Sequence, residues 1–343
     1  MMETKQKWYD RQEYKTRQGE LIIPADFPAF KYQLKNEWVV NRTKTKLYFK
    51  KDGISNYSEG ELIYSFFAKH FDMNVVDVIP AVQVYKENYV RKGVAIENFI
   101  SNSKTQKYIT AYDLKSLVAR KKFGITSYTY MASQVNSIEN NMALLKDIEY
   151  AIENKKPDKK IMVDKDIKQD MFQMHLLDYL FVNEDRHSNN FAFLIEEKKD
   201  CYRVSLSKIF DNSLVLGLSK FLYTDTNEVT KFFVKNHINN LGFRMSVKKQ
   251  FSKSINLDVF AKEVAQEIIK NQNLANLYKR MRRFDFDNFE SIVQKDIPEY
   301  KLEPEVLKII KLVFQQTTRR LNRYIKYYNE LSEQKTTQPE MEK

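Results

Sequence analysis

The chain has 343 residues, of which 43% are hydrophobic and 30% are charged, and this composition indicates a folded protein of one large domain or two lobes. Its seven glycines, no two of them closer than seven positions, exclude the glycine-rich phosphate loops of Rossmann and P-loop proteins. The formal net charge of +12 is spread along the sequence, so it is compatible with nucleic acid, an anionic membrane or an acidic partner and requires none of them.

Cysteine usage and hydropathy give a first expectation for the compartment. A single cysteine, Cys201, precludes an intramolecular disulfide and favours a reducing environment. The first residues contain no apolar segment typical of a signal peptide, and the sequence contains no apolar run of about 18 residues that could span a membrane. We therefore expect a cytoplasmic protein without stable membrane insertion, although the sequence is also compatible with secretion as an effector without a signal peptide.

The N-terminal third has the pattern of a small β-rich lobe. Residues 1–20 are polar and are predicted to be flexible, and residues 21–104 are assigned to the lobe. A helix is predicted to begin at Ser58, because Ser58 and Glu61 have the spacing of a capping box and apolar residues follow at helical intervals. Strands are predicted at 37–40, 46–50, 81–85 and 92–99.

The rest of the chain is mostly helical in pattern. Residues 105–333 are assigned to a larger helical lobe, residues 155–160 to a polar linker within it, and residues 334–343 to a disordered tail. Helices are predicted at 111–121, 134–154, 167–182, 257–272, 274–281 and 304–330. The expected fold is therefore α+β, with a small β-rich N-lobe and a larger helical C-lobe.

A dense group of polar residues follows the most apolar predicted helix. Residues 171–182 are apolar on nearly every side, which predicts a central buried helix, and His175 within it is predicted to be a hydrogen-bonded core residue. The polar segment 183–190 comes next, and residues 191–206 then read as a β-hairpin. The hairpin leads to Asp211, so helix, loop and hairpin are expected to bring Asp185, Asn190 and Asp211 together.

Those three side chains suit phosphoryl transfer. The reaction needs one carboxylate to orient the attacking hydroxyl and hard oxygen ligands for Mg²⁺. The spacing of Asp185 and Asn190 equals that of the kinase catalytic loop, and Asp211 follows Asn190 by 21 positions across the hairpin. Each feature alone is a weak signal, because Asp and Asn are common in turns; together they predict a kinase site.

The same residues resemble a known family. The run Asn183-Glu-Asp-Arg-His-Ser-Asn-Asn-Phe191, followed by Ile-Phe-Asp-Asn-Ser213, is similar to the HipA-like serine/threonine kinases, above all to their short members similar to bacterial cell-translocating kinase A. Its Asp-Arg-His core is also similar to that of phosphatidylinositol 3- and 4-kinases. The sequence departs from the family at Val182, where glycine is common, and after Asp211, where the glycine of the kinase metal motif is missing.

The resemblance implies a kinase fold that uses ATP and Mg²⁺. It implies that Asp185 orients the substrate hydroxyl, that His187 lies beside the phosphates, that Arg186 positions the loop, and that Asn190 and Asp211 bind Mg²⁺. The ATP contacts that it implies, from the phosphates to the adenine, are Lys50, Glu61, Thr43, Thr45, Glu97, Asn98 and Phe99. Within this set Glu61 could instead serve only as the capping-box residue, Glu59 competes for the pairing with Lys50, and a surface strand would also explain Lys50.

We therefore expect a bacterial serine/threonine protein kinase that uses ATP and Mg²⁺. Autophosphorylation in the region 41–58 is a further expectation, motivated by Thr43 and Thr45 beside the phosphate site. The expected partners are a substrate protein with a Ser or Thr acceptor and an antitoxin-like protein. Nucleic acid is not expected as a partner. The alternatives are a lipid or small-molecule kinase and, from another class, a basic nucleic-acid-binding protein without catalysis.

Overall fold

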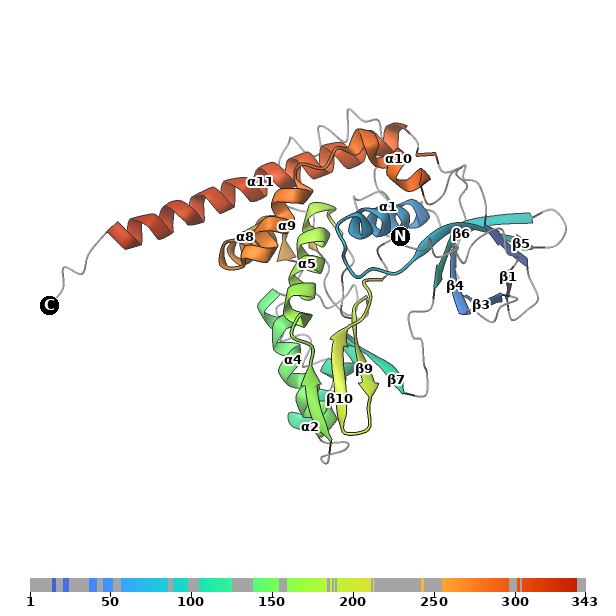
Figure 1. The fold of residues 1–343 in the computed structure, drawn as a ribbon, viewed down its shortest axis with the longest axis horizontal. Helices are drawn as coiled ribbons and strands as arrows, with labels where there is room; N and C mark the ends of the chain where they lie inside the picture. Colours follow the sequence, from blue (N-terminus) through green and yellow to red (C-terminus); the bar gives the residue numbers. More distant parts are fainter. Residues whose placement is uncertain are drawn as a thin grey trace, which may run out of the picture.

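Figure 1 shows the computed structural model of the chain. It describes residues 14–16, 21–24, 37–41, 46–51, 57–85, 89–97, 105–124, 138–153, 159–183, 186, 188, 190–210, 212, 242–243, 255–295, 301–302 and 304–337. For the strands before residue 52, only the path of the backbone is described. The fold is α+β, as predicted, with a β-barrel at one side and a larger part built mostly of helices (Figure 1).

Six strands of the N-terminal part form a closed barrel. These strands are β1 (Tyr14–Thr16), β2 (Leu21–Pro24), β3 (Glu37–Asn41), β4 (Lys46–Lys51), β5 (Val78–Tyr85) and β6 (Tyr89–Glu97). They are antiparallel, in the order β1-β2-β5-β6-β4-β3, and β1 closes the barrel by pairing with β3. Strand β1 falls inside the segment 1–20 that was expected to be flexible, while β3 to β6 lie where strands were predicted.

Helix α1 (Tyr57–His70) lies between β4 and β5 in the chain and contacts β4, β5 and β6. Its apolar side chains Leu62, Ile63 and Phe67 are buried, as the helical spacing predicted. The helix therefore lies against the barrel on one side and, through Phe67, enters the core of the helical part.

A second sheet supports the segment that carries the candidate site. Its order is β7 (Gln106–Thr110), β9 (Ala192–Glu197), β10 (Cys201–Leu206) and β8 (Lys160–Val163), with β8 parallel to β10 and the other pairs antiparallel. The β9–β10 hairpin was predicted. The two edge strands were not, and β8 begins at the end of the segment predicted to be a polar linker.

Six helices of the C-terminal part agree with their predicted positions apart from their ends, whereas the short helix at Phe289–Gln294 and the short strands at 242–243 and 255–256 were not predicted. The helices are α2 (Ala111–Lys122), α4 (Ile138–Glu153), α5 (Ile167–Leu180), α8 (Leu257–Lys270), α9 (Gln272–Met281), α10 (Phe289–Gln294) and α11 (Pro304–Thr337), with a 3₁₀ turn η3 (Phe286–Asn288) and the short strands β11 (Gly242–Phe243) and β12 (Ile255–Asn256). Helix α11 continues past residue 330, and its last turns extend beyond the other helices (Figure 1). Among the described residues, no helix has both the length and the apolar character needed to cross a membrane.

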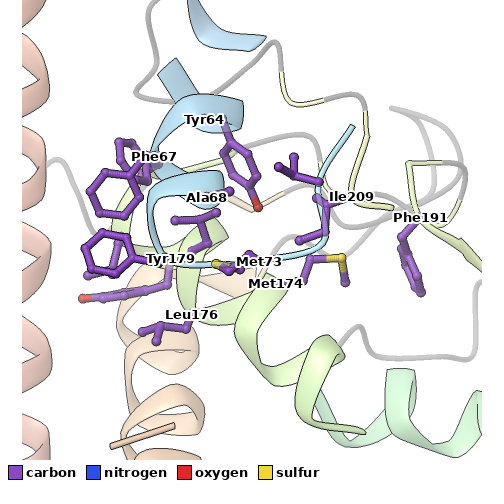
Figure 2. Packing of buried hydrophobic residues seen from close by; sticks show 14 of the residues in the cluster. Tyr64, Phe67, Ala68, Met73, Met174, Leu176, Tyr179, Phe191 and Ile209 are labelled. Carbon is purple, nitrogen blue, oxygen red and sulfur yellow. The ribbon is translucent and has the colours of Figure 1, made fainter. Parts of the chain in front are cut away.

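One hydrophobic core joins α1 to the helical part. Phe67 of α1 packs edge-on against Phe181 at the end of α5, with ring centroids 4.6 Å apart, and its ring also stacks on Phe286. Phe314 of α11 contacts all three rings. Figure 2 shows α1 residues Tyr64, Phe67 and Ala68 in the same cluster as Leu176 and Tyr179 of α5. Because packed aromatic cores resist small displacements, this cluster fixes α1 relative to α5.

Candidate functional site

The site begins at the C-terminal end of α5, which closes with a Schellman motif. The amide of Val182 donates to the carbonyl of Tyr179 at 3.2 Å, and the amide of Asn183 donates to the carbonyl of Asp178 at 2.8 Å. The motif requires a left-handed residue, usually glycine, and Val182 takes this position with φ of +50°. A β-branched residue is strained there, so the turn into the polar loop is held by its surroundings rather than by local preference.

Arg186 forms the centre of a buried polar network. Its side chain is fully buried and makes two hydrogen bonds to the carboxylate of Asp178, from Nε at 2.9 Å and from Nη2 at 3.0 Å. The hydroxyl of Tyr64, from α1, donates to the same carboxylate at 2.8 Å, and so does the side-chain amide Nδ2 of Asn183 at 2.8 Å. A buried ion pair needs such additional hydrogen bonds to satisfy its remaining polar atoms.

The same guanidinium holds two separate stretches of the chain. Its Nη1 donates to the carbonyl of Asn190 at 2.6 Å and to the carbonyl of Phe210 at 2.7 Å. Its Nη2 donates to the side-chain oxygen of Asn212. Arg186 therefore anchors Asn190 together with both sequence neighbours of Asp211.

The network raises the pKa values of two of its members, Arg186 and Tyr64, above the usual values for arginine and tyrosine. Burial alone would lower the pKa of Arg186, but Asp178 and Tyr64 raise it above the usual value for arginine. Burial and the neighbouring Asp178 raise the pKa of Tyr64 well above the usual value for tyrosine. Arg186 therefore stays charged and Tyr64 stays a hydrogen-bond donor at any physiological pH.

The N-terminus of α2 holds the polar loop from the other side. The amide of Tyr112 donates to the carbonyl of Ser188 at 2.9 Å, and the amide of Ala111 donates to the carbonyl of Phe191 at 3.2 Å. One turn later, Nζ of Lys115 lies 3.5 Å from Oγ of Ser188. Burial lowers the pKa of Lys115 to about 8, and the nearby Asp147 opposes this shift only in part. The loop is thus hydrogen-bonded to α2 and, through Arg186, to Asp178 of α5.

A main-chain contact joins the segment after α1 to the segment before Asp211. Val75 and Ile209 form a parallel β-bridge, in which the amide of Ile209 donates to the carbonyl of Asn74 at 2.8 Å and the amide of Val76 donates to the carbonyl of Ile209 at 3.0 Å. Oγ of Ser65, within α1, donates to the carbonyl of Val76 at 2.7 Å. The metal-binding segment expected from the sequence is therefore hydrogen-bonded to the α1–β5 connection.

The structure describes part of the set expected from the sequence. Arg186 and Asn190 are buried at the centre of the site, and Glu59 and Glu61 are buried on α1. The backbone of Lys50 lies in β4 opposite Val94 of β6, and Glu97 ends β6 opposite Leu47. The other expected residues, which lie outside the described part of the chain, are Asp185, His187, Asp211, Asn98, Phe99, Thr43 and Thr45.

Three central residues of the network were not among those expected. Asp178 carries a signal in the sequence, because a carboxylate inside an otherwise apolar helix requires a buried partner. Tyr64 and Asn212 carry none, because they lie 122 and 26 positions from Arg186 and meet it only in the folded chain.

The metal site expected from the sequence would bind Mg²⁺ through the side-chain oxygens of Asn190 and Asp211. Among the described residues, no group of three or more His, Cys, Asp or Glu side chains lies close enough to hold a metal ion. Asn190, buried and anchored through its carbonyl, offers an amide of the kind that binds Mg²⁺. Since Asp185 and Asp211 fall outside the described part, the metal site stays a prediction.

No protein-family model matches the sequence. No curated protein matches it either. Solved structures are similar to the chain. One is the proinflammatory kinase CtkA of Helicobacter pylori, with a TM-score of 0.54 and 16% sequence identity over 89% of this chain and 100% of that chain. The chain has a kinase fold. The resemblance to the HipA-like kinases is thus confirmed at the level of the fold.

Two further kinase structures are similar at lower scores. HipA of Shewanella oneidensis, solved with HipB and operator DNA as a toxin–antitoxin system, has a TM-score of 0.41 and 14% identity over 91% of this chain and 65% of its own. The golgi casein kinase has a TM-score of 0.39 and 10% identity over 87% of this chain and 71% of its own.

Proposed function

We propose that the protein is an ATP- and Mg²⁺-dependent kinase that transfers the γ-phosphate to a Ser or Thr hydroxyl of a protein. The observation that carries the proposal is the double anchorage at Arg186. One buried guanidinium holds Asn190 and the two neighbours of Asp211, although these stretches lie about 20 positions apart in the chain. This convergence supports the prediction that the Asp185–Asn190 loop and Asp211 serve one site.

In the proposed reaction, Asp185 accepts a hydrogen bond from the acceptor hydroxyl and orients its oxygen toward the γ-phosphorus. The new P–O bond forms as the bond between the γ-phosphorus and the β–γ bridging oxygen breaks, ADP leaves, and the hydroxyl proton passes to Asp185. The protein forms no covalent bond to the substrate, so the rate of phosphoryl transfer depends on the positioning of the reactants and on neutralisation of the phosphate charge. His187, beside the phosphates, and Arg186, through the loop, belong to this positioning.

Asn190 and Asp211 would hold Mg²⁺, which when bound neutralises the charge that develops on the phosphates. The nucleotide contacts proposed on the barrel side are Lys50 with its partner Glu61, the backbone of residues 97–99, and the turn with Thr43 and Thr45. Two observations support the pairing of Lys50 with Glu61. Strand β4 contacts α1, and Glu61 is fully buried on that helix.

Two carboxamide substitutions test the roles of the two aspartates. We expect Asp185→Asn to lower phosphoryl transfer by at least about 10²-fold, since an oriented base contributes about that much, while leaving ATP binding intact. We expect Asp211→Asn to lower transfer and also to weaken Mg²⁺–ATP binding, because it removes a proposed metal ligand. Calorimetric titration with Mg²⁺–ATP separates binding from the transfer assay.

Asp200→Asn is the matched control, because Asp200 is exposed in the turn of the β9–β10 hairpin, away from the network. It should behave as the wild type in both assays. Full activity of Asp185→Asn, or unchanged Mg²⁺–ATP affinity of Asp211→Asn, would contradict the assigned roles. Parallel assays with a generic protein substrate and with phosphoinositide vesicles decide between protein and lipid as the acceptor.

A further inference from the structure

Helix α1 is joined to the two loops of the proposed site by side-chain hydrogen bonds. The hydroxyl of Tyr64 donates to Asp178 at 2.8 Å and lies 3.4 Å from Nη2 of Arg186. The same Nη2 donates to Asn212, next to Asp211. Figure 2 shows the Tyr64 hydroxyl directed away from α1 into the packed core. A single guanidinium thus contacts α1, α5, the catalytic loop and the expected metal segment.

A second, independent connection runs through the main chain. The hydroxyl of Ser65, the next residue of α1, donates to the carbonyl of Val76, and the amide of Val76 donates to the carbonyl of Ile209. Phe210 follows directly and accepts from Arg186. Adjacent residues of α1 therefore reach the same segment by two routes, one through side chains and one through backbone. A displacement of α1 would have to break hydrogen bonds on both routes.

We propose that Tyr64, with Asp178 and Asn212, is a positioning residue that couples the placement of α1 to the geometry of the catalytic loop and of the metal segment. The proposal rests on the proposed function for its consequence in catalysis. Glu61, the proposed partner of Lys50, lies one helical turn before Tyr64. The placement of α1 would therefore set the nucleotide side and the metal side of the site together.

Tyr64→Phe is the variant of choice, because it deletes one hydroxyl and leaves the ion pair between Arg186 and Asp178 in place. Tyr179→Phe is its matched control. Tyr179 is equally buried, and its hydroxyl donates to the carbonyl of Thr317 in α11 at 3.1 Å. Tyr64→Phe loses a strong hydrogen bond to Asp178 and a longer one from Arg186, both within the network. Tyr179→Phe loses one buried hydrogen bond outside the network.

Amide hydrogen exchange tests the coupling without requiring activity. In Tyr64→Phe we expect the amides of Val76, Ile209 and Tyr112 to exchange about tenfold faster relative to the amides of α8, as a lost hydrogen bond to a charged group implies. In Tyr179→Phe this ratio should stay at the wild-type value. Equal ratios in the two variants would overturn the coupling.

The Mg²⁺ requirement of phosphoryl transfer tests the consequence for catalysis. Tyr64→Phe should raise the Mg²⁺ concentration at half-maximal transfer about tenfold, and Tyr179→Phe should leave it unchanged even if both lower the melting temperature alike. Asn212→Ser should act in the same direction, and its effect should be non-additive with Tyr64→Phe but additive with Tyr179→Phe.

The two tests separate the inference from the proposed function. If the wild type transfers no phosphate from ATP, the proposed function is wrong, and hydrogen exchange still decides whether Tyr64 couples α1 to the two loops. If the wild type is active and Tyr64→Phe matches Tyr179→Phe in both measurements, the function stands and the positioning role of Tyr64 is wrong.

Discussion

At the scale of single residues, position 182 is one where glycine should give a more stable protein than alanine, the reverse of the usual order within a helix. Its φ of +50° lies in the left-handed region, where a Cβ atom costs about 1 kcal/mol or more and glycine costs nothing. We therefore expect Val182→Gly to have a larger free energy of unfolding than Val182→Ala by about 1 kcal/mol, although glycine also removes the buried Cβ atom that alanine keeps. Urea denaturation of the two variants measures the difference.

Val118, buried inside α2 in an ordinary helical position, provides the control. There Val118→Ala should be more stable than Val118→Gly. The assignment of a left-handed turn would be wrong if alanine were also the more stable substitute at position 182. The kinases that the sequence resembles commonly have glycine here, which agrees with this backbone conformation.

His175 makes the stability of the protein sensitive to acid. It is fully buried, and neither ring nitrogen has a hydrogen-bond partner among the described residues, so the predicted hydrogen-bonded state is not observed there. Burial lowers its pKa to about 4. Because the unfolded chain binds this proton near pH 6.5 and the folded chain does not, stability should fall as pH decreases from 6.5 toward 4, by up to about 3 kcal/mol.

His175→Leu should flatten this acid limb and leave stability at pH 7 unchanged or higher, because it removes two buried polar atoms. Melting temperatures between pH 4 and pH 7 measure the effect. His70→Gln is the control, because His70 is exposed and its substitution should retain most of the acid limb. An unchanged acid limb in His175→Leu would show that another group is responsible.

Sequence patterns predicted the residues whose role depends on local spacing. Asn190 and Arg186 stand out because they follow a buried helix at the spacing of a catalytic loop. Tyr64 does not, because its role arises from a contact with Arg186 across 122 positions and its own surroundings in the sequence resemble any apolar helix face. Buried polar contacts between distant segments carry little signal in a single sequence.

At the scale of secondary-structure elements, α11 supports the end of α5 through one threonine. Oγ1 of Thr317 is buried 3.0 Å from the carbonyl of Leu180, whose place at the helix end leaves it without a helical donor. The same hydroxyl lies 3.0 Å and 3.1 Å from the carbonyls of Val313 and Phe314 in its own helix, which already have helical donors. Thr317→Val should lower the free energy of unfolding by about 1–3 kcal/mol, because it leaves this buried carbonyl unsatisfied. Chemical denaturation measures the loss.

The neighbouring Thr318 is the matched control. Its Oγ1 is buried and has no hydrogen-bond partner among the described residues. Thr318→Val should therefore be neutral or slightly stabilising. Equal losses in the two variants would show that the hydrogen bond of Thr317 is not responsible.

The elements that the sequence predicted best have either one apolar face or, as in α5, apolar residues on nearly every side. Helices α2, α5, α8 and α9 and the β9–β10 hairpin lie within a few residues of their predicted bounds. Strands β7 and β8 were missed, because they are short edge strands with half-exposed or exposed side chains, and their pairing depends on partners far along the chain. Short edge strands depend on tertiary context more than on their own sequence.

At the scale of the whole molecule, the scarcity of glycine and the kinase fold are compatible. A glycine-poor chain lacks loops whose backbone surrounds phosphate, so the proposed site assigns phosphate contacts to Lys50, to Mg²⁺ and to a polar turn. The structure provides a rigid frame for that arrangement, since the core of α1, α5 and α11 is continuous and Arg186 lies beside it. The division into residues 21–104 and 105–333 stays a prediction.

The central claim is that this chain transfers phosphate from ATP to a hydroxyl. The most direct measurement is the transfer of γ-phosphate label from Mg²⁺–ATP to protein, followed by identification of the labelled amino acid. We predict label on serine or threonine with the wild type, at least about 10²-fold less label with Asp185→Asn, and no label when Mg²⁺ is chelated. Absence of label with the folded wild type, or equal labelling by Asp185→Asn, would contradict the account.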